Sequence, residues 1–386
     1  MKMSKTAVAL GAVLALAACS DESPVAGRAP VAAPLMSAGA NAIEGSYIVV
    51  LNEGADPRSV AAIAGVEPGH VYTAALNGFS AELNQGQLNA LRHNPNVAYV
   101  EQDQLGSVEI TQSGATWGLD RIDQTSNTLN GTYIYTTTAS NVTAYVIDTG
   151  ILPTHTQFGT RAASVYNSAG GSANDCNGHG THVAGTIGGT IHGVAKGVRL
   201  RGVKVLGCSG SGSFSGIIAG VDWVRLNATK PAVANLSLGG GFSSSLNTAV
   251  NNLANSGVFV AVASGNSNAN ACNYSPASAA NVTSVNASTS SSAKASFSNY
   301  GSCTHLYAPG QSITSTWHTS TTATNTISGT SMASPHVAGV GALYLAGNPG
   351  ASNATVRSWI INNATTGVIS GNPSGTANRL LNKRAL

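Results

Sequence analysis

The sequence predicts an α/β protein: a large domain with a mostly parallel central sheet and helices on both faces, preceded by a small α+β domain. From Trp117 onward, short apolar runs bounded by glycine alternate with longer helical stretches. This pattern is typical of buried parallel strands joined by helices. Residues 43–111 carry a shorter set of strand-like and helix-like runs. Hydrophobic residues make up 42% of the 386-residue chain, enough to bury a core and to exclude a disordered protein.

Charged side chains are scarce and unevenly spread. They make up 9% of the chain, against about 25% in an ordinary soluble domain, which argues against a coiled coil and against a nucleic-acid-binding protein. Residues 43–111 have eight acidic and two basic side chains, whereas residues 112–386 have five acidic and thirteen basic ones. The net charges are −6 and +8, so the two parts are expected to attract each other.

The N-terminus has the features of a secretory signal. Two lysines near the start precede an apolar run over residues 6–18, which is too short to span a bilayer comfortably. The run ends in LAAC at Cys19, which resembles the lipobox of bacterial lipoproteins; the alternative is an ordinary signal peptide with a chance cysteine. We therefore expect a signal peptide over residues 1–19. Residues 20–42, rich in Ala, Pro, Ser and Gly, are expected to be a flexible linker.

The small domain, residues 43–111, is expected to contain three strands and one helix. The strand-like runs are residues 47–51, 78–83 and 97–101, and the helix-like run is 87–92. In the large domain, buried strands are expected at 143–147, 203–206, 233–236, 258–262 and 282–285, with helices at 181–188, 214–227, 245–256 and 331–346. This alternation predicts the parallel sheet with a helix layer on each face.

Three residues of the large domain lie at strand ends or helix starts, where catalytic residues are expected. Asp148 ends an apolar strand, where open α/β sheets place their active sites, and His179 enters a helix of small residues. Ser331 opens a helix, near free N–H groups that can stabilise an oxyanion. Each residue alone could equally be a turn, helix-start or capping residue. Together, in this order, they suit a serine nucleophile activated by a histidine that a buried carboxylate orients.

The segments around these residues resemble the catalytic motifs of subtilisin-like serine proteases. They read VIDTG at 146–150, NGHGTHVAG at 177–185 and SGTSMASPH at 328–336. Within that family the chain is most similar to the proteinase K branch and its bacterial aqualysin-like members. The resemblance implies a three-layer subtilisin-like fold for residues 112–386 and an inhibitory propeptide in residues 43–111.

The resemblance also implies a role for each matching position. Asp148 would be the orienting acid, His179 the general base and Ser331 the nucleophile. Asn266 matches the side-chain donor of the oxyanion hole, with the backbone N–H of Ser331 as its partner; otherwise it would be a turn residue after a strand. His182 matches a structural residue of the helix.

A substrate cleft follows from the same resemblance. Its edges would pair with an extended peptide backbone, which favours broad sequence specificity. The matching residues are Gly210, Ser211 and Gly212 on one edge; Ser237, Leu238 and Gly239 on the other; Ala263, Ser264 and Gly265, with Leu238, around the first specificity pocket; and Phe214 at a more remote apolar pocket. None of these residues is charged, so we expect apolar or aromatic side chains before the cut bond.

The chain has five cysteines, an odd number. Cys19 lies in the signal, and the other four allow three pairings. Their spacings of 32 and 31 residues match the two bridges of aqualysin-like proteases, so the resemblance implies Cys176–Cys208 and Cys272–Cys303. An exported protein permits such bridges.

A zinc site is the alternative use of part of this region. Cys176, His179 and His182 stand close together in the sequence. However, Cys-x₂-His-x₂-His is not a common zinc pattern, and the chain has no His-Glu-x-x-His motif. We therefore expect no zinc.

Calcium is the metal that members of this family usually bind. Asp120, Asp123 and Gln124 match ligand positions of one family site, but Asn130 replaces an acid there. At a second site His305 stands where relatives commonly carry a ligating aspartate. Calcium takes several oxygen ligands, including carboxylates. We therefore expect at most one weak structural calcium, and no cofactor for the chemistry itself.

These observations predict an exported serine endopeptidase of broad specificity that acts through an acyl-enzyme. It would be made as a precursor that cuts itself near residues 109–112, and would work as a monomer on protein or peptide substrates. It would be secreted, or lipid-anchored at the cell envelope before processing. The alternatives from other classes are a catalytically silent binding module on the same fold and a lipid-anchored adhesion protein. All four catalytic positions are filled, which argues against the silent module.

Overall fold

The computed structural model describes residues 31–38, 42–104 and 109–386. The expected signal peptide and its cysteine lie outside these residues. The chain divides between Ser107 and Val108 into two compact units. Within the described residues, no helix is both long enough and apolar enough to cross a membrane.

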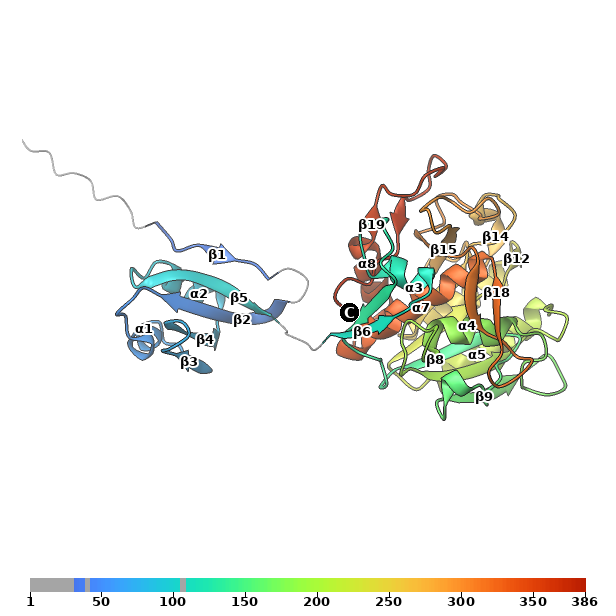
Figure 1. Cartoon of the computed structure of the whole chain (residues 1–386), viewed down its shortest axis with the longest axis horizontal. Coiled ribbons are helices and arrows are strands. Elements are labelled where there is room, and N and C mark those ends of the chain that lie inside the picture. Colours follow the sequence, from blue (N-terminus) through green and yellow to red (C-terminus); the bar gives the residue numbers. More distant parts are fainter. Residues whose placement is uncertain (1–30, 39–41, 105–108) are drawn as a thin grey trace, which may run out of the picture. The chain divides into compact units, whose positions relative to one another are not determined.

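The first unit is a five-stranded sheet with two helices, the α+β arrangement predicted from the sequence (Figure 1). Its elements are β1 (Leu35–Met36), β2 (Ala42–Leu51), α1 (Pro57–Ile63), β3 (His70–Tyr72), β4 (Gly78–Glu82), α2 (Gln85–Arg92) and β5 (Val97–Gln104). The sheet order is β1-β5-β2-β4-β3, and every pair except β1 and β5 is antiparallel. Val49 and Phe79 of the sheet are fully buried in one core with Leu88 and Leu91 of α2.

The prediction of a flexible linker over residues 20–42 is wrong for the C-terminal part of this segment. Leu35 lies opposite Val100 in the parallel pairing of β1 with β5. Just before it, the N–H of Ala33 donates to the carbonyl of Arg92 (2.6 Å), and Nε of Arg92 donates to the carbonyl of Ala33 (2.9 Å). The pairing covers the edge of β5, which would otherwise be open. The partners of residues 33–36 lie about 60 residues further along the chain, so the local composition could not predict this pairing.

The second unit is built on a nine-stranded sheet in the order β19-β20-β16-β15-β13-β11-β8-β10-β9. The strands are β8 (Thr143–Asp148), β9 (Ala162–Asn167), β10 (Arg199–Lys204), β11 (Ala232–Leu236), β13 (Phe259–Ala263), β15 (Thr283–Ser288), β16 (Leu306–Pro309), β19 (Thr365–Thr366) and β20 (Arg379–Leu380). Every pair is parallel except β19 and β20, which confirms the predicted mostly parallel sheet.

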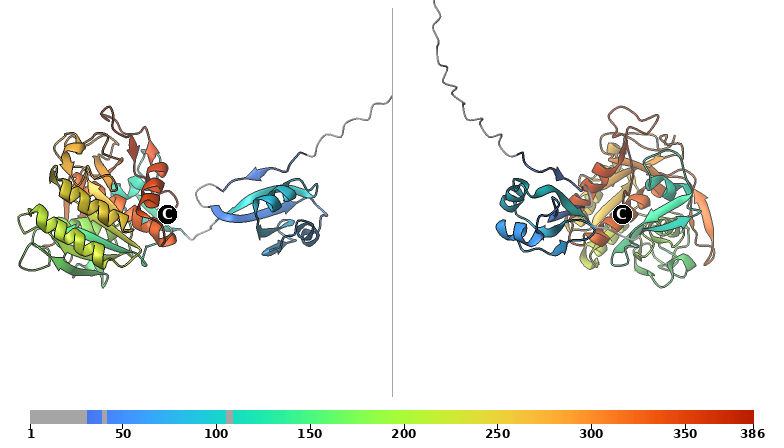
Figure 2. Two further views of the ribbon diagram at one scale, coloured as in Figure 1. Left: turned by 180° about the vertical axis from the view of Figure 1, so that it is seen from behind. Right: turned by 60° about the vertical axis from the view of Figure 1, so that its left-hand side comes forward.

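Helices cover both faces of this sheet and complete three layers. They are α3 (Trp117–Ile122), α4 (His179–Gly188), α5 (Phe214–Asn227), α6 (Ser244–Asn255), α7 (Thr330–Gly347) and α8 (Asn353–Asn363). Residues of α4 and α7 pack in one core with one set of sheet side chains, and residues of α5 and α6 in a second core with the other set. Figure 2 shows α5 and α6 side by side. The predicted helices correspond to α4, α5, α6 and α7 within one or two residues at each end.

Short strands outside the main sheet form three two-stranded ribbons. They are β6 (Ile110–Ser113) with β7 (Thr132–Tyr135), β12 (Gly240–Gly241) with β14 (Tyr274–Ser275), and β17 (Ile313–Thr316) with β18 (Thr324–Ile327). Ile110 and Thr111, which the sequence analysis placed in the first domain, thus pair with β7 in the second unit. The boundary between the units therefore lies before Ile110 rather than after residue 111.

Candidate active site

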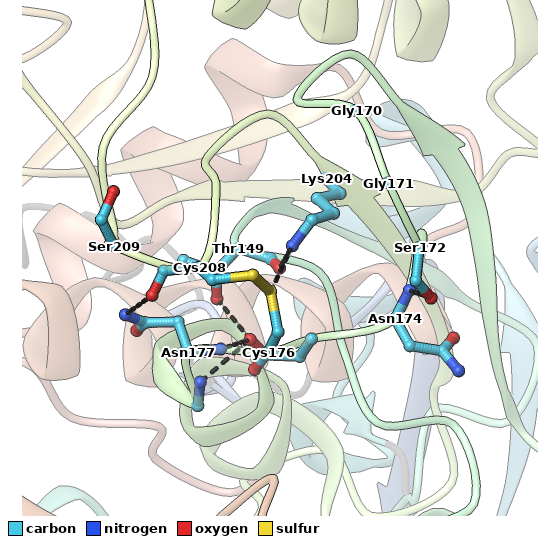
Figure 3. Close-up of a disulfide and its surroundings, with 12 residues drawn as sticks. Thr149, Gly170, Gly171, Ser172, Asn174, Cys176, Asn177, Lys204, Cys208 and Ser209 are labelled. Atoms are coloured by element: carbon cyan, nitrogen blue, oxygen red, sulfur yellow. Dashed lines mark hydrogen bonds between the residues drawn. A yellow bond between two sulfur atoms is a disulfide. The ribbon is translucent and has the colours of Figure 1, made fainter.

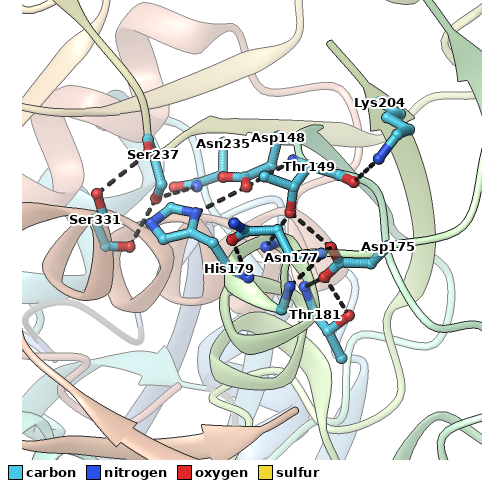
Figure 4. A network of polar contacts seen from close by, with 12 residues as sticks. Asp148, Thr149, Asp175, Asn177, His179, Thr181, Lys204, Asn235, Ser237 and Ser331 are labelled. Carbon is cyan, nitrogen blue, oxygen red and sulfur yellow. Dashed lines mark hydrogen bonds and ion pairs between the residues drawn. The ribbon is translucent and has the colours of Figure 1, made fainter. Parts of the chain in front are cut away.

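The predicted acid, Asp148, lies at the C-terminal end of β8. It is fully buried, and its Oδ1 accepts the backbone N–H of Thr149 (2.7 Å) and lies 2.8 Å from Nδ1 of His179 (Figure 4). Strand β8 lies between β10 and β11, where the chain changes direction across the sheet and α/β proteins form ligand sites. A carboxylate can only accept a hydrogen bond, so this contact places the proton on Nδ1 of His179 and leaves Nε2 as an acceptor.

The predicted base, His179, is the first residue of α4. Its side chain is 24% exposed, so it reaches the surface of the cleft. A β-carbon on the next residue, Gly180, would collide with the carbonyl oxygen of Gly150, so the missing side chain lets α4 approach the end of β8 closely. Burial opposes the charged ring, but the charge and hydrogen bond of Asp148, with the charge of Asp175, outweigh it and raise the pKa of His179.

Asp175 anchors the loop that leads into α4. Its two oxygens accept five hydrogen bonds, of 2.6–2.9 Å, from Thr149, Asn177, Gly178 and Thr181. Thr149 Oγ1 in turn accepts the N–H at the second residue of the helix. Sequence reasoning did not link Asp175 to the site. Its position four residues before His179 was the available signal.

The predicted nucleophile, Ser331, is the second residue of α7. Its hydroxyl donates to the carbonyl of Ser237 (3.2 Å), and the Ser237 hydroxyl donates to the carbonyl of Ser331 (2.7 Å). Ser237 directly follows β11, the neighbour of β8, so adjacent strand ends hold the acid and the nucleophile. Figure 4 shows the ring of His179 between Asp148 and Ser331.

Asn266 presents its amide nitrogen beside the start of α7. Its Oδ1 accepts two bonds from Thr330, one from the backbone N–H (2.9 Å) and one from the hydroxyl (2.8 Å). A β-carbon on Gly329 would lie 3.4 Å from Asn266 Nδ2 and 3.6 Å from the backbone nitrogen of Ser331. The two donors therefore border the same small space, as an oxyanion hole requires.

Two cavities flank this centre and contain all the predicted substrate-binding residues. A cavity of about 270 Å³ is lined by Leu238, Gly239, Ala263, Ser264, Gly265, Asn266 and Ser331. Another of about 320 Å³ is lined by His179, Gly210, Ser211, Gly212, Phe214, Ser237, Leu238 and Gly239. Sequence reasoning missed Tyr274, Ser275 and Ala277 in the first cavity and Leu206 and Ile217 in the second. These residues come from separate elements, and no local motif marks them.

Disulfides join Cys176 to Cys208 and Cys272 to Cys303, the pairing that the resemblance implied. The first bridge connects the loop before His179 with the loop that carries Gly210 (Figure 3). Because Cys176 is bonded to Cys208, its sulfur is not available as a ligand of the alternative zinc site. Among the described residues, no group of three histidine, cysteine or acidic side chains could hold a metal.

The predicted calcium ligands lie together but do not fit a tight site. Asp120 accepts the backbone N–H of Gly131 (2.6 Å), that of Asn130 (3.3 Å) and the side-chain amide of Gln124. Asp123 Oδ1 is buried without a hydrogen-bond partner, and burial raises the pKa of Asp123 to about 6. Calcium takes six to eight oxygen ligands, and here only one carboxylate oxygen of the predicted ligands, Asp123 Oδ1, is shown buried without a hydrogen-bond partner.

Comparison with known proteins agrees with this geometry. Residues 139–380 match the model of the subtilase family of peptidases, and residues 46–108 match the model of peptidase inhibitor I9. The chain is 51% identical to the extracellular serine proteinase of Thermus sp. (strain Rt41A), over 96% of each protein, and 44% identical to proteinase R of Parengyodontium album, over 90% and 91%. A crystal structure of a cold-adapted subtilisin-like serine proteinase superposes with a TM-score of 0.69 at 51% identity, covering 71% of this chain and all of that one. The chain therefore belongs to the subtilase family of serine proteases and carries an inhibitor I9 propeptide.

Proposed function

We propose that this protease cleaves peptide bonds through an acyl-enzyme, with Ser331 as nucleophile, His179 as general base and Asp148 as the acid that orients it. The observation that carries the proposal is the 2.8 Å contact between His179 Nδ1 and Asp148 Oδ1 beside Ser331. Nε2 of His179 is then free to take the serine proton. The resting hydrogen bond of Ser331 to Ser237 breaks when substrate enters, because the hydroxyl then turns toward the histidine.

Each step uses a group already in place. Ser331 Oγ attacks the peptide carbonyl as His179 removes its proton, and the resulting oxyanion accepts bonds from Asn266 Nδ2 and the Ser331 N–H. The imidazolium, stabilised by Asp148, then protonates the departing amine. Water repeats the sequence on the acyl-enzyme and releases the acid product.

Specificity is proposed to be broad, with apolar or aromatic side chains before the cut bond. The first cavity supports this because its lining combines Leu238, Ala263, Ala277 and the ring of Tyr274 without a charged side chain. Phe214 adds apolar surface to the second cavity. Backbone pairing along the cleft would accept many sequences. Competition between peptides with Phe, Leu, Lys or Glu before the cut bond tests this, and a preference for Lys or Glu would refute it.

The enzyme is proposed to be exported, to work as a monomer and to mature by its own cut near residues 109–112. Strand β6 starts at Ile110 and belongs to the second unit, which favours a cut at or before that strand. A lipid anchor at Cys19 and one weak calcium near Asp120 remain part of the proposal. Intact mass of the exported product, with and without a chelator, tests the processing site, the anchor and the metal.

Ser331→Ala tests the mechanism. The variant should stay an uncut precursor and should not react with a fluorophosphonate, whereas the wild-type enzyme should be labelled on Ser331. A silent binding module would give no labelling in either protein. A cut and active Ser331→Ala protein would overturn the proposed nucleophile.

A further inference from the structure

A buried lysine lies directly behind the catalytic centre. Lys204 is the last residue of β10, opposite Asp148 in the pairing with β8, and it is 1% exposed. Its ammonium donates to the carbonyl of Thr149 (2.6 Å) and lies 3.5 Å from Sγ of Cys176 (Figure 3). A cation taken out of water is costly unless nearby charges and acceptors compensate it.

Thr149 connects this ammonium to two buried carboxylates. Its backbone N–H donates to Asp148 Oδ1 (2.7 Å), and its hydroxyl donates to Asp175 Oδ1 (2.9 Å), while its carbonyl accepts from Lys204 (Figure 4). One residue next to the catalytic acid thus holds a cation and two anions in fixed positions. Moving Lys204 would release the carbonyl end of that residue.

The charges around His179 favour its protonated form unless a cation opposes them. Burial works against the charged ring, whereas Asp148 and Asp175 raise the pKa of His179. Those carboxylates also act on Lys204: burial lowers its pKa, and Asp175 and then Asp148 raise it. An ammonium has the same sign as an imidazolium, and charges in the protein interior are poorly screened, so this cation is expected to oppose protonation of His179.

The surroundings contain few other charges. The titratable or charged groups on the packed elements are Asp148 and Tyr145 of β8, Tyr166 of β9, Asp175 and His179 at the start of α4, His182 within α4, the exposed Asp222 and Arg225 of α5, and Arg199 and Arg201 of β10 itself; β9 also contributes the neutral Asn167 opposite Lys204. The pKa of His182 is lowered to about 3, chiefly by burial, so this ring is neutral at the working pH. Lys204 is the cation that contacts the residue bridging both carboxylates.

We propose that Lys204 is a positioning residue of this protease: a buried counter-charge that holds the Thr149 peptide in place and makes His179 harder to protonate. The proposal rests on the catalytic roles proposed above for Asp148 and His179. It adds a function for a residue that touches neither the substrate nor the reacting atoms. Its signature is therefore a shifted pH profile rather than a loss of activity at every pH.

The test is the pH dependence of kcat/KM in charge-changing variants of the mature enzyme. At low pH, kcat/KM falls as His179 of the free enzyme takes up a proton; this fall is the acid limb of the profile. Lys204→Met removes the cation, so the midpoint of the acid limb should move to a higher pH by about half a unit to one unit. At pH values below the limb, kcat/KM should fall about threefold to tenfold, with the alkaline plateau much less affected. Lys204→Arg keeps the charge, and its limb should stay near the wild-type position.

Lys230→Met is the matched control, because it removes one positive charge from an exposed lysine. Its limb should stay at the wild-type pH. If Lys204→Met does not fold, Lys204→Gln, which keeps a donor toward Thr149, carries the same expectation. The role of Lys204 would be overturned if the acid limb kept its wild-type position in a folded, active Lys204→Met or Lys204→Gln enzyme. It would also be overturned if Lys204→Met and Lys204→Arg shifted the limb equally. An inactive wild-type enzyme would instead overturn the proposed function itself.

Discussion

Thr330 holds the side-chain amide of Asn266 by two hydrogen bonds, from its backbone N–H and from its hydroxyl, both to Oδ1. This arrangement turns the oxygen end of the amide toward Thr330, the first residue of α7. The nitrogen end is left beside the N–H of Ser331, where the proposed mechanism places the oxyanion. The orientation of the donor thus depends on the residue immediately before the nucleophile.

Asn266→Ala should lower kcat by about 10²–10³ with little change in KM, because it removes a donor used only in the transition state. Thr330→Val keeps the backbone N–H and loses the hydroxyl, so kcat should fall about fivefold, the value of one ordinary hydrogen bond. Steady-state kinetics on one peptide substrate measures both. Equal losses in the two variants, or a loss confined to KM, would contradict the assigned orientation.

Gly180→Ala should nearly abolish activity. A β-carbon there would collide with the carbonyl oxygen of Gly150, so α4 would have to move away from β8. This movement would separate His179 from Asp148 and break their contact. Gly347→Ala, at the end of α7 and in open space, is the control and should leave kcat/KM unchanged. The measurement is activity together with the melting temperature of each variant. A fully active Gly180→Ala enzyme would mean that α4 tolerates the displacement.

The mature enzyme should lose stability in acid. Burial is the largest cause that lowers the pKa of His182 to about 3 and of His305 and His336 to about 4, so folding favours their neutral forms. That stability is complete above the unfolded histidine pKa of about 6.5 and is lost as the pH falls toward 4. The raised pKa of Asp123, about 6, and the raised pKa of His179 act in the opposite direction, and the loss expected from the three buried histidines is opposed to that extent.

Melting temperatures of the fluorophosphonate-inhibited enzyme between pH 8 and pH 4 measure this effect without autolysis. His336→Gln removes one of the three titrations and should give a shallower fall between pH 6.5 and 4, whatever its stability at pH 8. An equally steep fall would show that His336 is protonated to the same extent in both the folded and unfolded protein.

Removal of the Cys176–Cys208 bridge should affect both stability and catalysis. Replacing both cysteines with serine should cost about 3–4 kcal/mol in the chain-entropy model for a loop of this length. It should also lower kcat/KM, because the bridge ties the loop before His179 to the loop that lines the second cavity with Gly210. Denaturant unfolding and peptide kinetics provide the two readouts.

The double serine variant at Cys272 and Cys303 is the comparison, since its loop differs by one residue in length. Its loss of unfolding free energy should be similar. If the Cys176–Cys208 variant kept full kcat/KM while losing the expected stability, the bridge would have no part in shaping the cleft.

Much of the fold could be predicted because the pattern of apolar residues is local. The strand ending at Asp148 and the helices predicted at 214–227 and 245–256 follow from hydrophobic runs in the sequence. Segments held by distant partners could not be predicted in this way. The strand β1, expected to be a flexible linker, takes its structure from hydrogen bonds to β5 and Arg92.

The sequence by itself determined which chemistry this protein carries, because each catalytic motif combines a reactive side chain with the glycines and small residues that its local turn or helix start needs. The tertiary structure decided what surrounds that chemistry. Lys204, Asp175 and Thr149 act together only because β8 and β10 are neighbours and α4 begins beside them. Tyr274 and Ala277 reach the first cavity in the same way, from elements that no motif connects. Electrostatic and packing interactions depend on distance in space, and only the folded chain sets that distance.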